Sequence, residues 1–581
     1  MSDQTPQPGM RTRQAGESGG RPSAARAAAA RAAEVRAGAV KAAAGSLARA
    51  GAQVSHPRQT VAAGGRRLQV AAAVIAALAV GVGYSYMDKP AAATASNTGA
   101  AAPTDAPVNS AMVACPIVTG SADAAIAAYT PLNAAANKAA AASPSASASA
   151  GSSGSTGNFA RVSIAGTTDP LFSFTQTGAI YTSTGQSGNI SNLNQESQPF
   201  TGQAEGAFAP GFTATETLSS TSVTNEQGLA ATPCTAPATN LWFIGTELGP
   251  DQQALLNMVD TDAVSAQVNI SGYTGSGPIS STTMAADQGL VVGAQSEYSG
   301  TIDLTQLNTA AGGSGSNAAG NPLAVDVSAT SGRVAAALLD SDGGNGRDFV
   351  LPQQPATHLV IPGVPAPSSN PSTPMKLELM LLSPTADTGV TLKWIGHSTI
   401  TPTVTVPQLN AGQVAQVNIS SIPTSGEPAA LEIDSTSGTP VIAEVKVTAE
   451  GGSDTAYLSP VPALTGESVV AANTAGSVVE LTNKGATGAQ VLVTAEGGTS
   501  PVSQTVSVPA GSTVATTVQA PPGASTFAIS VTPMGGAGSI YAARLMTDGN
   551  GGLTIQPMTT ALEDVQVPPV HQDLSGTVPQ S

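Results

Sequence analysis

The sequence predicts an all-β fold: tandem immunoglobulin-like antiparallel β-sandwich units behind a single N-terminal transmembrane helix and a disordered or partly helical basic tail. Three observations predict this class. A long apolar run separates a basic segment from an acidic one, short alternating runs rich in Val, Thr and Ile fill the acidic part, and related segments recur there about every hundred residues. Only 10% of the 581 residues are charged and 3% are aromatic, which argues against a nucleic-acid binder and a helical bundle.

The N-terminal tail, residues 1–67, carries a net charge of +8, whereas the rest of the chain carries −24, for a total of −16. Residues 1–23 are rich in Gly, Pro, Ser and Gln, which predicts disorder, and the Ala-rich residues 24–50 favour helix. Two roles stay open for the tail: a loose contact with anionic lipid headgroups, or a solvated segment that only sets the topology. Its charges spiral around a helix without forming one face, so no nucleic-acid partner is expected.

The apolar run is residues 68–87, and it contains no charged residue. Twenty helical residues span about 30 Å, the thickness of the hydrocarbon core of a bilayer, so this segment predicts a helix that spans the lipid bilayer. Excess Lys and Arg mark the cytoplasmic side, so we expect a single-pass protein of the cell membrane, with residues 1–67 in the cytoplasm and residues 88–581 extracellular. A cleaved signal peptide is the alternative, since the small residues Ala93 and Ala95 fit a processing site.

The two cysteines, Cys115 and Cys234, both lie on the expected outer side of the membrane. An even, sparse count in an exported chain favours one disulfide. The bond would close a loop of 119 residues, and chain-entropy arguments give about 4–5 kcal/mol for a loop of that size. No histidine or further cysteine lies nearby, so the pair predicts a disulfide rather than a metal site.

The acidic part of the chain repeats with a period near one hundred residues. Three segments share a strand, a Gly-containing turn and a second strand, which predicts a hairpin in each. These segments are Leu323–Asp340, Leu431–Val447 and Phe527–Met546. Further matches in the same register are Val404–Pro407 with Val506–Pro509, and Leu379–Pro384 with Val478–Asn483, for which Leu255–Asn257 is the first copy. About seven short strands per unit predict an antiparallel β-sandwich of immunoglobulin-like type.

These patterns divide the chain into eight parts. They are the basic cytoplasmic tail (1–67), the transmembrane helix (68–87), a linker (88–107), an N-terminal β domain with a flexible insertion (108–232), three β-sandwich units (233–350, 351–463 and 464–561) and a polar tail (562–581). The N-terminal β domain has strand patterns at Arg161–Ile164, Ile180–Thr182 and Thr213–Leu218, without an identified copy of the repeat.

Four motifs in the acidic part carry a family resemblance: CTAPATNLWFIG (Cys234–Gly245), the strand that ends at Asn257, GRDFVLP (Gly346–Pro352) and VIPGVP (Val360–Pro365). With them, residues 110–560 resemble an actinobacterial family of large secreted or membrane-anchored β-rich envelope proteins of unknown function. The resemblance implies an extracytoplasmic envelope protein built of β domains. It implies no activity and no functional residues.

The sequence predicts no catalytic residue, no cofactor and no metal site. The four histidines are far apart, and no P-loop, nucleophile elbow or dinucleotide fingerprint occurs. Two interpretations of the acidic stretch Asp340–Asp348 stay open, a Ca²⁺ site and an inter-domain turn. The turn is favoured, because Asn345 replaces the glycine and Leu351 the glutamate that an EF-hand loop requires.

Trp242 and Trp394 lie in apolar strand patterns, so we expect them to be buried between sheets rather than to stack on sugars. The sequence therefore predicts a membrane-anchored, non-catalytic protein with a structural or interaction role in the cell envelope. Its expected partners are the bilayer, through residues 68–87, and envelope polysaccharide or other envelope proteins. Two alternatives remain: an accessory glycan-binding subunit for envelope polysaccharide assembly or transport, and a cleaved secreted protein or hydrolase with an inter-domain site.

Overall fold

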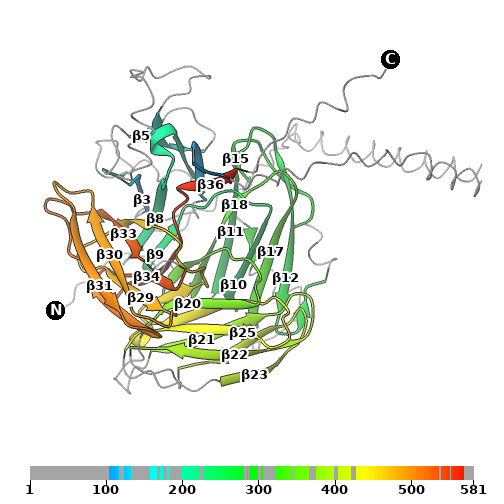
Figure 1. The fold of residues 1–581 in the computed structure, drawn as a ribbon. Coiled ribbons are helices and arrows are strands. Elements are labelled where there is room, and N and C mark those ends of the chain that lie inside the picture. The colour runs from blue at the N-terminus through cyan, green and yellow to red at the C-terminus, as the bar shows by residue number, and fades with distance from the viewer. Residues whose placement is uncertain are drawn as a thin grey trace, which may run out of the picture. The chain divides into compact units, whose positions relative to one another are not determined.

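The computed structural model is nearly all β in the residues that it describes, and these belong to one compact unit, Ala101–Ser581 (Figure 1). The described residues are 104–116, 124–131, 158–165, 170–174, 179–182, 199–220, 227–249, 252–280, 284, 287–298, 302–304, 321–342, 344–365, 375–397, 404–420, 427–535, 538–549 and 551–567. The expected cytoplasmic tail (1–67) and transmembrane helix (68–87) lie outside them. Within this part of the chain, no helix is long and apolar enough to cross a membrane.

Strands β2 to β35 form four successive units, each with two antiparallel sheets around an apolar core. Unit 1 contains β2 (Ser110–Cys115), β3 (Ala124–Tyr129), β4 (Phe159–Ile164), β5 (Pro170–Ser173), β6 (Ile180–Thr182), β7 (Phe200–Glu205), β8 (Thr213–Ser220) and β9 (Gly228–Pro233), with a 3₁₀ turn at Gly206–Phe208. Unit 2 contains β10 (Asn240–Leu248), β11 (Gln252–Asp260), β12 (Ala266–Thr274), β13 (Gly277–Pro278), β14 (Leu290–Val292), β15 (Ser296–Glu297), β16 (Ile302–Asp303), β17 (Asn321–Ser331), β18 (Ala335–Asp342) and β19 (Arg347–Val350).

The last two units follow without interruption. Unit 3 contains β20 (His358–Val364), β21 (Lys376–Leu382), β22 (Thr388–Ile395), β23 (Val404–Leu409), β24 (Val414–Asn418), β25 (Ala429–Ser435), β26 (Ile442–Thr448) and β27 (Thr455–Leu458), with a 3₁₀ turn at Glu450–Gly452. Unit 4 contains β28 (Ser468–Asn473), β29 (Val478–Asn483), β30 (Ala489–Glu496), β31 (Val502–Val508), β32 (Ser512–Thr517), β33 (Phe527–Met534), β34 (Ile540–Thr547) and β35 (Leu553–Met558).

All four units have the same strand order. In unit 3, one sheet runs β20-β25-β22-β23 and the other β24-β21-β26-β27. Units 1 and 4 repeat this order. Unit 2 repeats it too, except that β13 and β14 together replace the fourth strand along the chain, and β15 and β16 together replace the fifth. The N-terminal β domain, in which the sequence shows no copy of the repeat, is therefore a fourth copy of the same unit.

The three predicted hairpins are wrong. β17 and β18 flank the turn at Gly332 but belong to different sheets, and the same holds for β25 with β26 and for β33 with β34. Gly332 has a φ of +72°, which favours glycine, and its turn carries the chain across the sandwich instead of back along the same sheet. A strand–turn–strand pattern specifies a reversal of the chain, but it does not specify which sheet the second strand joins.

The four units pack into a closed ring. The first strand of each unit lies against the seventh strand of the next: β2 against β18, β10 against β26, β20 against β34 and β28 against β8. Apolar clusters with members from both units fill the junctions; they include Leu218 and Phe349, Trp242 and Met380, Val360 and Tyr541, and Tyr129 and Val469. Because neighbouring units cover them, β18 and β26 are buried along their whole length.

Two short strands join the ends of the ring. β1 (Thr104–Pro107) pairs antiparallel with β36 (Asp564–Val567). They lie inside the expected linker (88–107) and polar tail (562–581), for which the sequence predicts no strand. Their pairing depends on the ring, which brings the start of unit 1 next to the end of unit 4.

The axial cavity as candidate functional site

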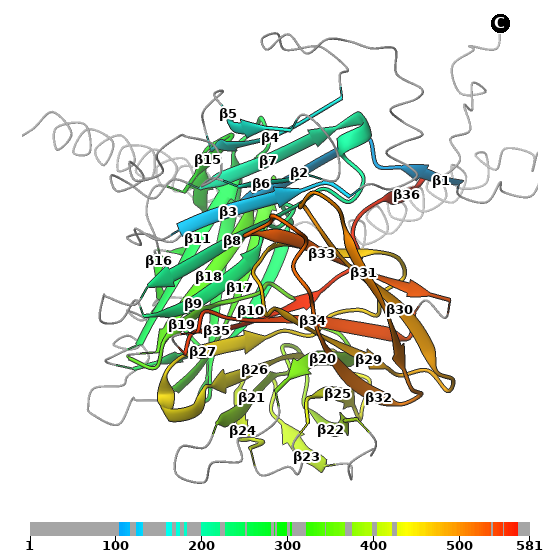
Figure 2. The same ribbon diagram turned by 90° about the vertical axis from the view of Figure 1, so that its left-hand side faces the viewer.

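The last strands of the four units meet at the centre of the ring. β9 contacts β19 and β35, and β27 contacts the same two strands, so the four surround one axis (Figure 2). We call them the central strands. Each is the edge strand of its own sheet, and its first residues lie at one end of the axis while the linker that follows it lies at the other.

A single carboxylate joins the beginnings of all four central strands. Asp454, which directly precedes β27, is fully buried. Its Oδ2 accepts hydrogen bonds from the backbone N–H of Leu229 (2.9 Å) and Leu553 (2.6 Å), and its Oδ1 accepts those of Thr455 (2.9 Å) and Arg347 (3.3 Å). Burial raises the pKa of Asp454 to about 6, although the four donors act to lower it. This carboxylate links units 1, 2, 3 and 4 through backbone atoms.

Glycines make room for that carboxylate. Gly228 is the first residue of β9, and Gly346 stands directly before β19. Each directly precedes a residue whose backbone N–H donates to Asp454, as Asp454 itself precedes Thr455. A Cβ on Gly228 would lie 2.2 Å from Asp454 Oδ1, and one on Gly346 would lie 1.9 Å from it. Both glycines also have a positive φ, of +116° and +97°. The centre of the ring therefore accommodates the side chain of one repeat where two others have none.

A second carboxylate binds the central strands two residues further along. Asp348 Oδ1 accepts the backbone N–H of Ala231 (3.1 Å) and of Phe349 (2.9 Å), and the hydroxyl of Thr554 donates to Oδ2 (3.1 Å). Burial raises the pKa of Asp348 well above its usual range. Asp348 thus accepts hydrogen bonds from residues of units 1, 2 and 4.

The other acids of the Asp340–Asp348 stretch lie between units 2 and 3. The Nζ of Lys446 lies 3.0 Å from Asp342 Oδ2 and 3.4 Å from Glu247 Oε2, and the hydroxyl of Tyr457 donates to Asp340. Burial raises the pKa of Asp340 to about 7. Burial lowers the pKa of Lys446, but the three carboxylates raise it more, so it lies above its ordinary value. The carboxylates of the stretch therefore contact different partners instead of facing one ion.

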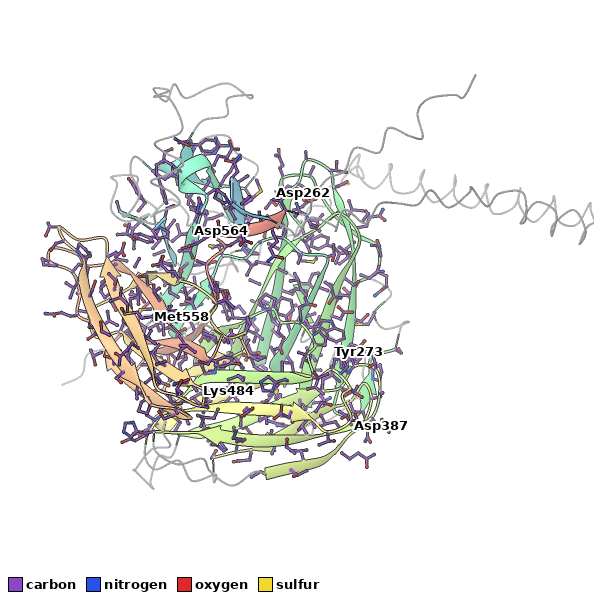
Figure 3. All side chains as sticks on the ribbon, viewed as in Figure 1. Asp262, Tyr273, Asp387, Lys484, Met558 and Asp564 are labelled. Carbon is purple, nitrogen blue, oxygen red and sulfur yellow. A yellow bond between two sulfur atoms is a disulfide. The ribbon has the colours of Figure 1, made fainter. Side chains whose placement is uncertain are left out.

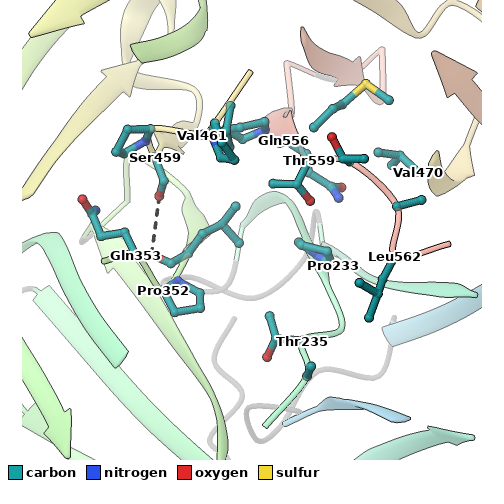
Figure 4. Close-up of a pocket in the computed structure, with 18 of the residues that line it drawn as sticks. Pro233, Thr235, Pro352, Gln353, Ser459, Val461, Val470, Gln556, Thr559 and Leu562 are labelled. Atoms are coloured by element: carbon teal, nitrogen blue, oxygen red, sulfur yellow. Dashed lines mark hydrogen bonds between the residues drawn. The ribbon is translucent and has the colours of Figure 1, made fainter. Parts of the chain in front are cut away.

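The axial cavity lies at the other end of the central strands, where the linkers that follow them converge. It has a volume of about 640 Å³, within the usual range of ligand sites. Figure 4 shows Thr235, Pro352, Ser459, Thr559 and Leu562 around it, so residues from three linkers and from the segment after β35 contribute. The lining contains five prolines, several aliphatic side chains, hydroxyls and carboxamides, and its one titratable side chain is a histidine.

Two buried ionisable residues lie behind the polar part of this lining. Arg544 Nη2 donates to the side-chain oxygen Oε1 of Gln556 (2.6 Å), and Ser459 and Gln353 donate to Glu444 Oε2 (2.6 Å and 3.2 Å). Burial lowers the pKa of Arg544 to about 10, so it keeps its charge at neutral pH, and burial raises the pKa of Glu444 well above its ordinary value. Both side chains are fully buried, and their contacts orient groups that line the cavity.

A histidine and two carboxylates near the cavity form the group that could hold a metal ion within the described residues. The ligand atoms of His358, Glu432 and Asp434 lie within 4.8 Å of one another. However, Lys484 Nζ lies 2.7 Å from both His358 Nε2 and Glu432 Oε1, and Lys393 Nζ lies 3.0 Å from Glu432 Oε2. Burial raises the pKa of Glu432, but the two lysines lower it more, so it lies below its usual value. The group is an ion-pair network between unit 3 and unit 4, to which unit 4 contributes Lys484, the residue labelled in Figure 3.

The cysteines and tryptophans singled out from the sequence are buried in the cores of units or at a junction between units. Cys115 and Cys234 form the predicted disulfide, with 4.5 Å between their Cα atoms, and both belong to the core of unit 1. Trp394 is 1% exposed in the core of unit 3, and Trp242 is 7% exposed at the junction of units 2 and 3. Burial of both tryptophans confirms the expectation that they pack between sheets.

The sequence analysis missed the axial cavity and both central carboxylates. One signal for the cavity is present in the sequence: a proline stands within two residues of the end of each central strand. These prolines are Pro233, Pro352, Pro460 and Pro557, and all four line the cavity. No local signal distinguishes Asp454 or Asp348, because most of their donors come from other repeats.

Fold and site define a class: an all-β protein of four sandwich units around a central axis with a cavity at one end. Residues 190–519 match a family of unknown function, DUF5719. This match covers more than half of the chain, so the chain belongs to that family, and the expectation of a family without a known function is confirmed.

No curated protein matches the chain. A solved structure with partial similarity is Streptomyces avermitilis alpha-L-rhamnosidase complexed with L-rhamnose, at 11% sequence identity and a TM-score of 0.11. The alignment covers 60% of this chain and 50% of that one, so the chain spans half the length of that protein. A TM-score this low carries no argument about fold or function.

Proposed function

We propose that the protein is a membrane-anchored, non-catalytic scaffold of the cell envelope, whose four-unit ring is extracellular and is anchored by a helix at residues 68–87. The observation that carries the proposal is the closed ring itself. Its polar centre connects four units through backbone amides, which is the arrangement of a rigid support. The helix, the actinobacterial origin and the cytoplasmic position of residues 1–67 are parts of this proposal that rest on the sequence.

The buried charged groups support a structural role. Asp454 and Asp348 bind backbone N–H groups of the central strands, and Lys446 holds carboxylates of unit 2 against unit 3. Each of these groups is therefore engaged in holding units together. A catalytic acid, base or nucleophile instead needs access to a substrate atom within hydrogen-bond reach.

The disulfide supports an extracellular ring. Cys115 and Cys234 are bonded, and such bonds persist in oxidising compartments rather than in a reducing cytoplasm. The charge asymmetry points the same way, because the positive segment 1–67 precedes the apolar run and the acidic segment follows it.

The units are also proposed to be variants of the immunoglobulin fold. In each, the second strand pairs with the fifth and the third with the sixth, as β21 with β24 and β22 with β25 do in unit 3. Immunoglobulin domains have the corresponding B–E and C–F pairs. Here, however, the first strand lies beside the sixth, where an immunoglobulin domain has its last strand.

Protease shaving of intact cells tests the proposed topology. A full-length chain with a different tag at each end is treated with a protease that does not enter the cell, and both tags are followed by immunoblot. We expect the C-terminal tag to disappear while the N-terminal tag stays on a membrane-bound fragment; lysed cells, in which both tags should disappear, are the control. A C-terminal tag that survives in intact cells would overturn the proposal.

An accessory glycan-binding role is the second candidate, and the axial cavity favours it. The cavity combines aliphatic surface with neutral hydrogen-bonding groups, as ligand sites for uncharged polar molecules do. A sugar platform at Trp394 is not part of this candidate, because that side chain is buried in the core of unit 3.

A further inference from the structure

The lining of the axial cavity is neutral although two ionisable residues lie directly behind it. The side chains that line it include no Asp, Glu, Lys or Arg, and His358 is the one titratable side chain among them. A charged ligand would lose its hydration without gaining an opposite charge on the cavity wall, which is costly. The lining therefore favours an uncharged ligand.

The polar groups of the cavity are oriented from behind. The carbonyl oxygen of Gln556 accepts from Arg544, so its amide NH₂ group points away from the guanidinium and is available as a donor. The hydroxyl of Ser459 donates to Glu444, so its oxygen keeps capacity to accept. Arg544 and Glu444 are fully buried, which fixes these two orientations before any ligand arrives.

The wall of the cavity also holds an unsatisfied hydroxyl. Within the described residues, the buried Oγ1 of Thr235 has no hydrogen-bond partner. A buried polar atom without a partner destabilises the native state, so a turn of the Thr235 side chain toward the cavity would let a ligand atom that can both donate and accept gain a hydrogen bond there. Hydroxyl groups have this double capacity.

Much of the rest of the lining is apolar. Val461, Val470 and Leu562 line the cavity together with five prolines. A saccharide ring presents C–H surface on its faces and hydroxyls around its rim, which matches a wall that alternates aliphatic and polar groups. We infer that the axial cavity binds the end of a neutral saccharide; this inference rests on the second candidate function above.

Direct binding to the purified full-length chain in detergent tests the inference. The probes are neutral oligosaccharides of two to four hexose or pentose residues, and matched oligosaccharides that contain hexuronic acids; binding is measured by isothermal titration calorimetry. Thr559→Trp places an indole at the exposed mouth of the cavity. Thr474→Trp is the matched control, because Thr474 is also exposed and lines a second cavity of about 610 Å³ between units 1 and 4.

We expect at least one neutral probe to bind, a loss of at least tenfold in affinity in Thr559→Trp, and a change of less than twofold in Thr474→Trp. Thr235→Val removes one hydroxyl at nearly constant volume and should weaken binding three- to tenfold. If circular dichroism shows that Thr559→Trp does not fold, the affinity of Thr235→Val is the test of the inference. Binding of acidic probes alone, binding that Thr559→Trp leaves intact, or no binding of any neutral probe would overturn the inference. Protease shaving is independent of these results, so the scaffold proposal stands or fails separately.

Discussion

Replacing Asp454 with alanine tests whether one carboxylate holds the ring together. The side chain accepts four backbone N–H donors, one from the beginning of each central strand, with distances from 2.6 Å to 3.3 Å. Alanine leaves all four donors without this acceptor at a site that is closed to solvent. Asparagine keeps one acceptor oxygen and places an NH₂ group against the donors of the other.

The expected cost follows from the number of lost hydrogen bonds. A buried hydrogen bond contributes about 1 kcal/mol to the free energy of unfolding, so Asp454→Ala should lower that free energy by about 4 kcal/mol and Asp454→Asn by about 2 kcal/mol or more. Typical total stabilities are about 5–15 kcal/mol, so either loss is large. We choose pH 8, above the pKa of about 6, so that the native carboxylate is charged.

The assay combines global and local stability. Urea unfolding of the full-length chain is followed by tryptophan fluorescence, since Trp242 and Trp394 are buried in the native state. Hydrogen exchange with mass spectrometry then follows peptides that contain the first residues of β9, β19, β27 and β35. Asp564→Ala is the matched control, because Asp564 is exposed and its loss should change neither measurement.

The distribution of the effect decides the reasoning. If Asp454 links four units, exchange should accelerate in all four central strands, including β9, whose Leu229 is 225 residues away in the sequence. An Asp454→Ala variant with unchanged unfolding, or with faster exchange in β27 alone, would refute the idea of a shared anchor.

Three further predictions follow from other parts of the ring. Burial raises the pKa of Glu216 and of Glu480 from 4.5 to about 8. Between these pH values the native state keeps both protons, whereas the unfolded state has released them. The free energy of unfolding should therefore fall between about pH 4.5 and pH 8, by about 1.4 kcal/mol per pH unit and group. The free energy of unfolding, measured with urea at several pH values in this range, should depend less steeply on pH in the double variant Glu216→Gln, Glu480→Gln. An unchanged dependence on pH would contradict the assignment. Thiol labelling of unfolded, unreduced protein should leave the Cys115–Cys234 pair unmodified, and serine at both positions should lower the free energy of unfolding by about 4 kcal/mol; full labelling would disprove the bond. Ending the chain at Glu563 removes β36. Because an isolated two-stranded sheet is marginally stable, hydrogen exchange should accelerate at residues 104–107 while the midpoint of urea unfolding stays the same. A shifted midpoint would contradict this prediction and show that the β1–β36 pair stabilises the whole ring.

The junctions between units explain why the four units form one compact body rather than four independently moving domains. Trp242 packs at the junction of units 2 and 3 instead of in either core, and Tyr457 of unit 3 packs into the core of unit 2. Interfaces between linked domains are commonly small and polar, which permits motion. Here aromatic and aliphatic side chains from both neighbours fill each junction, so the axial cavity has walls that come from several units yet keep a fixed geometry.

The sequence by itself determined the elements and the faces that they bury. Alternating apolar residues predict strands, the matched segments occupy equivalent strands in successive units, and the apolar surroundings of Trp394 predict its burial. The sparse cysteine pair predicts the bond between Cys115 and Cys234. These inferences succeed because strand patterning and side-chain burial are properties of a short stretch of chain.

How these elements meet depends on contacts between residues that lie far apart in the sequence. The turn at Gly332 has the local pattern of a hairpin, yet the strands on either side join different sheets. Asp454 sits in a stretch of glycines and small polar residues that reads as an ordinary turn, and it becomes the anchor of four strands only because the ring brings three distant backbone segments to it. Apolar patterning states that a surface is buried, but not which surface covers it. The cavity, the ring closure and the central carboxylates therefore had no counterpart in the sequence pattern.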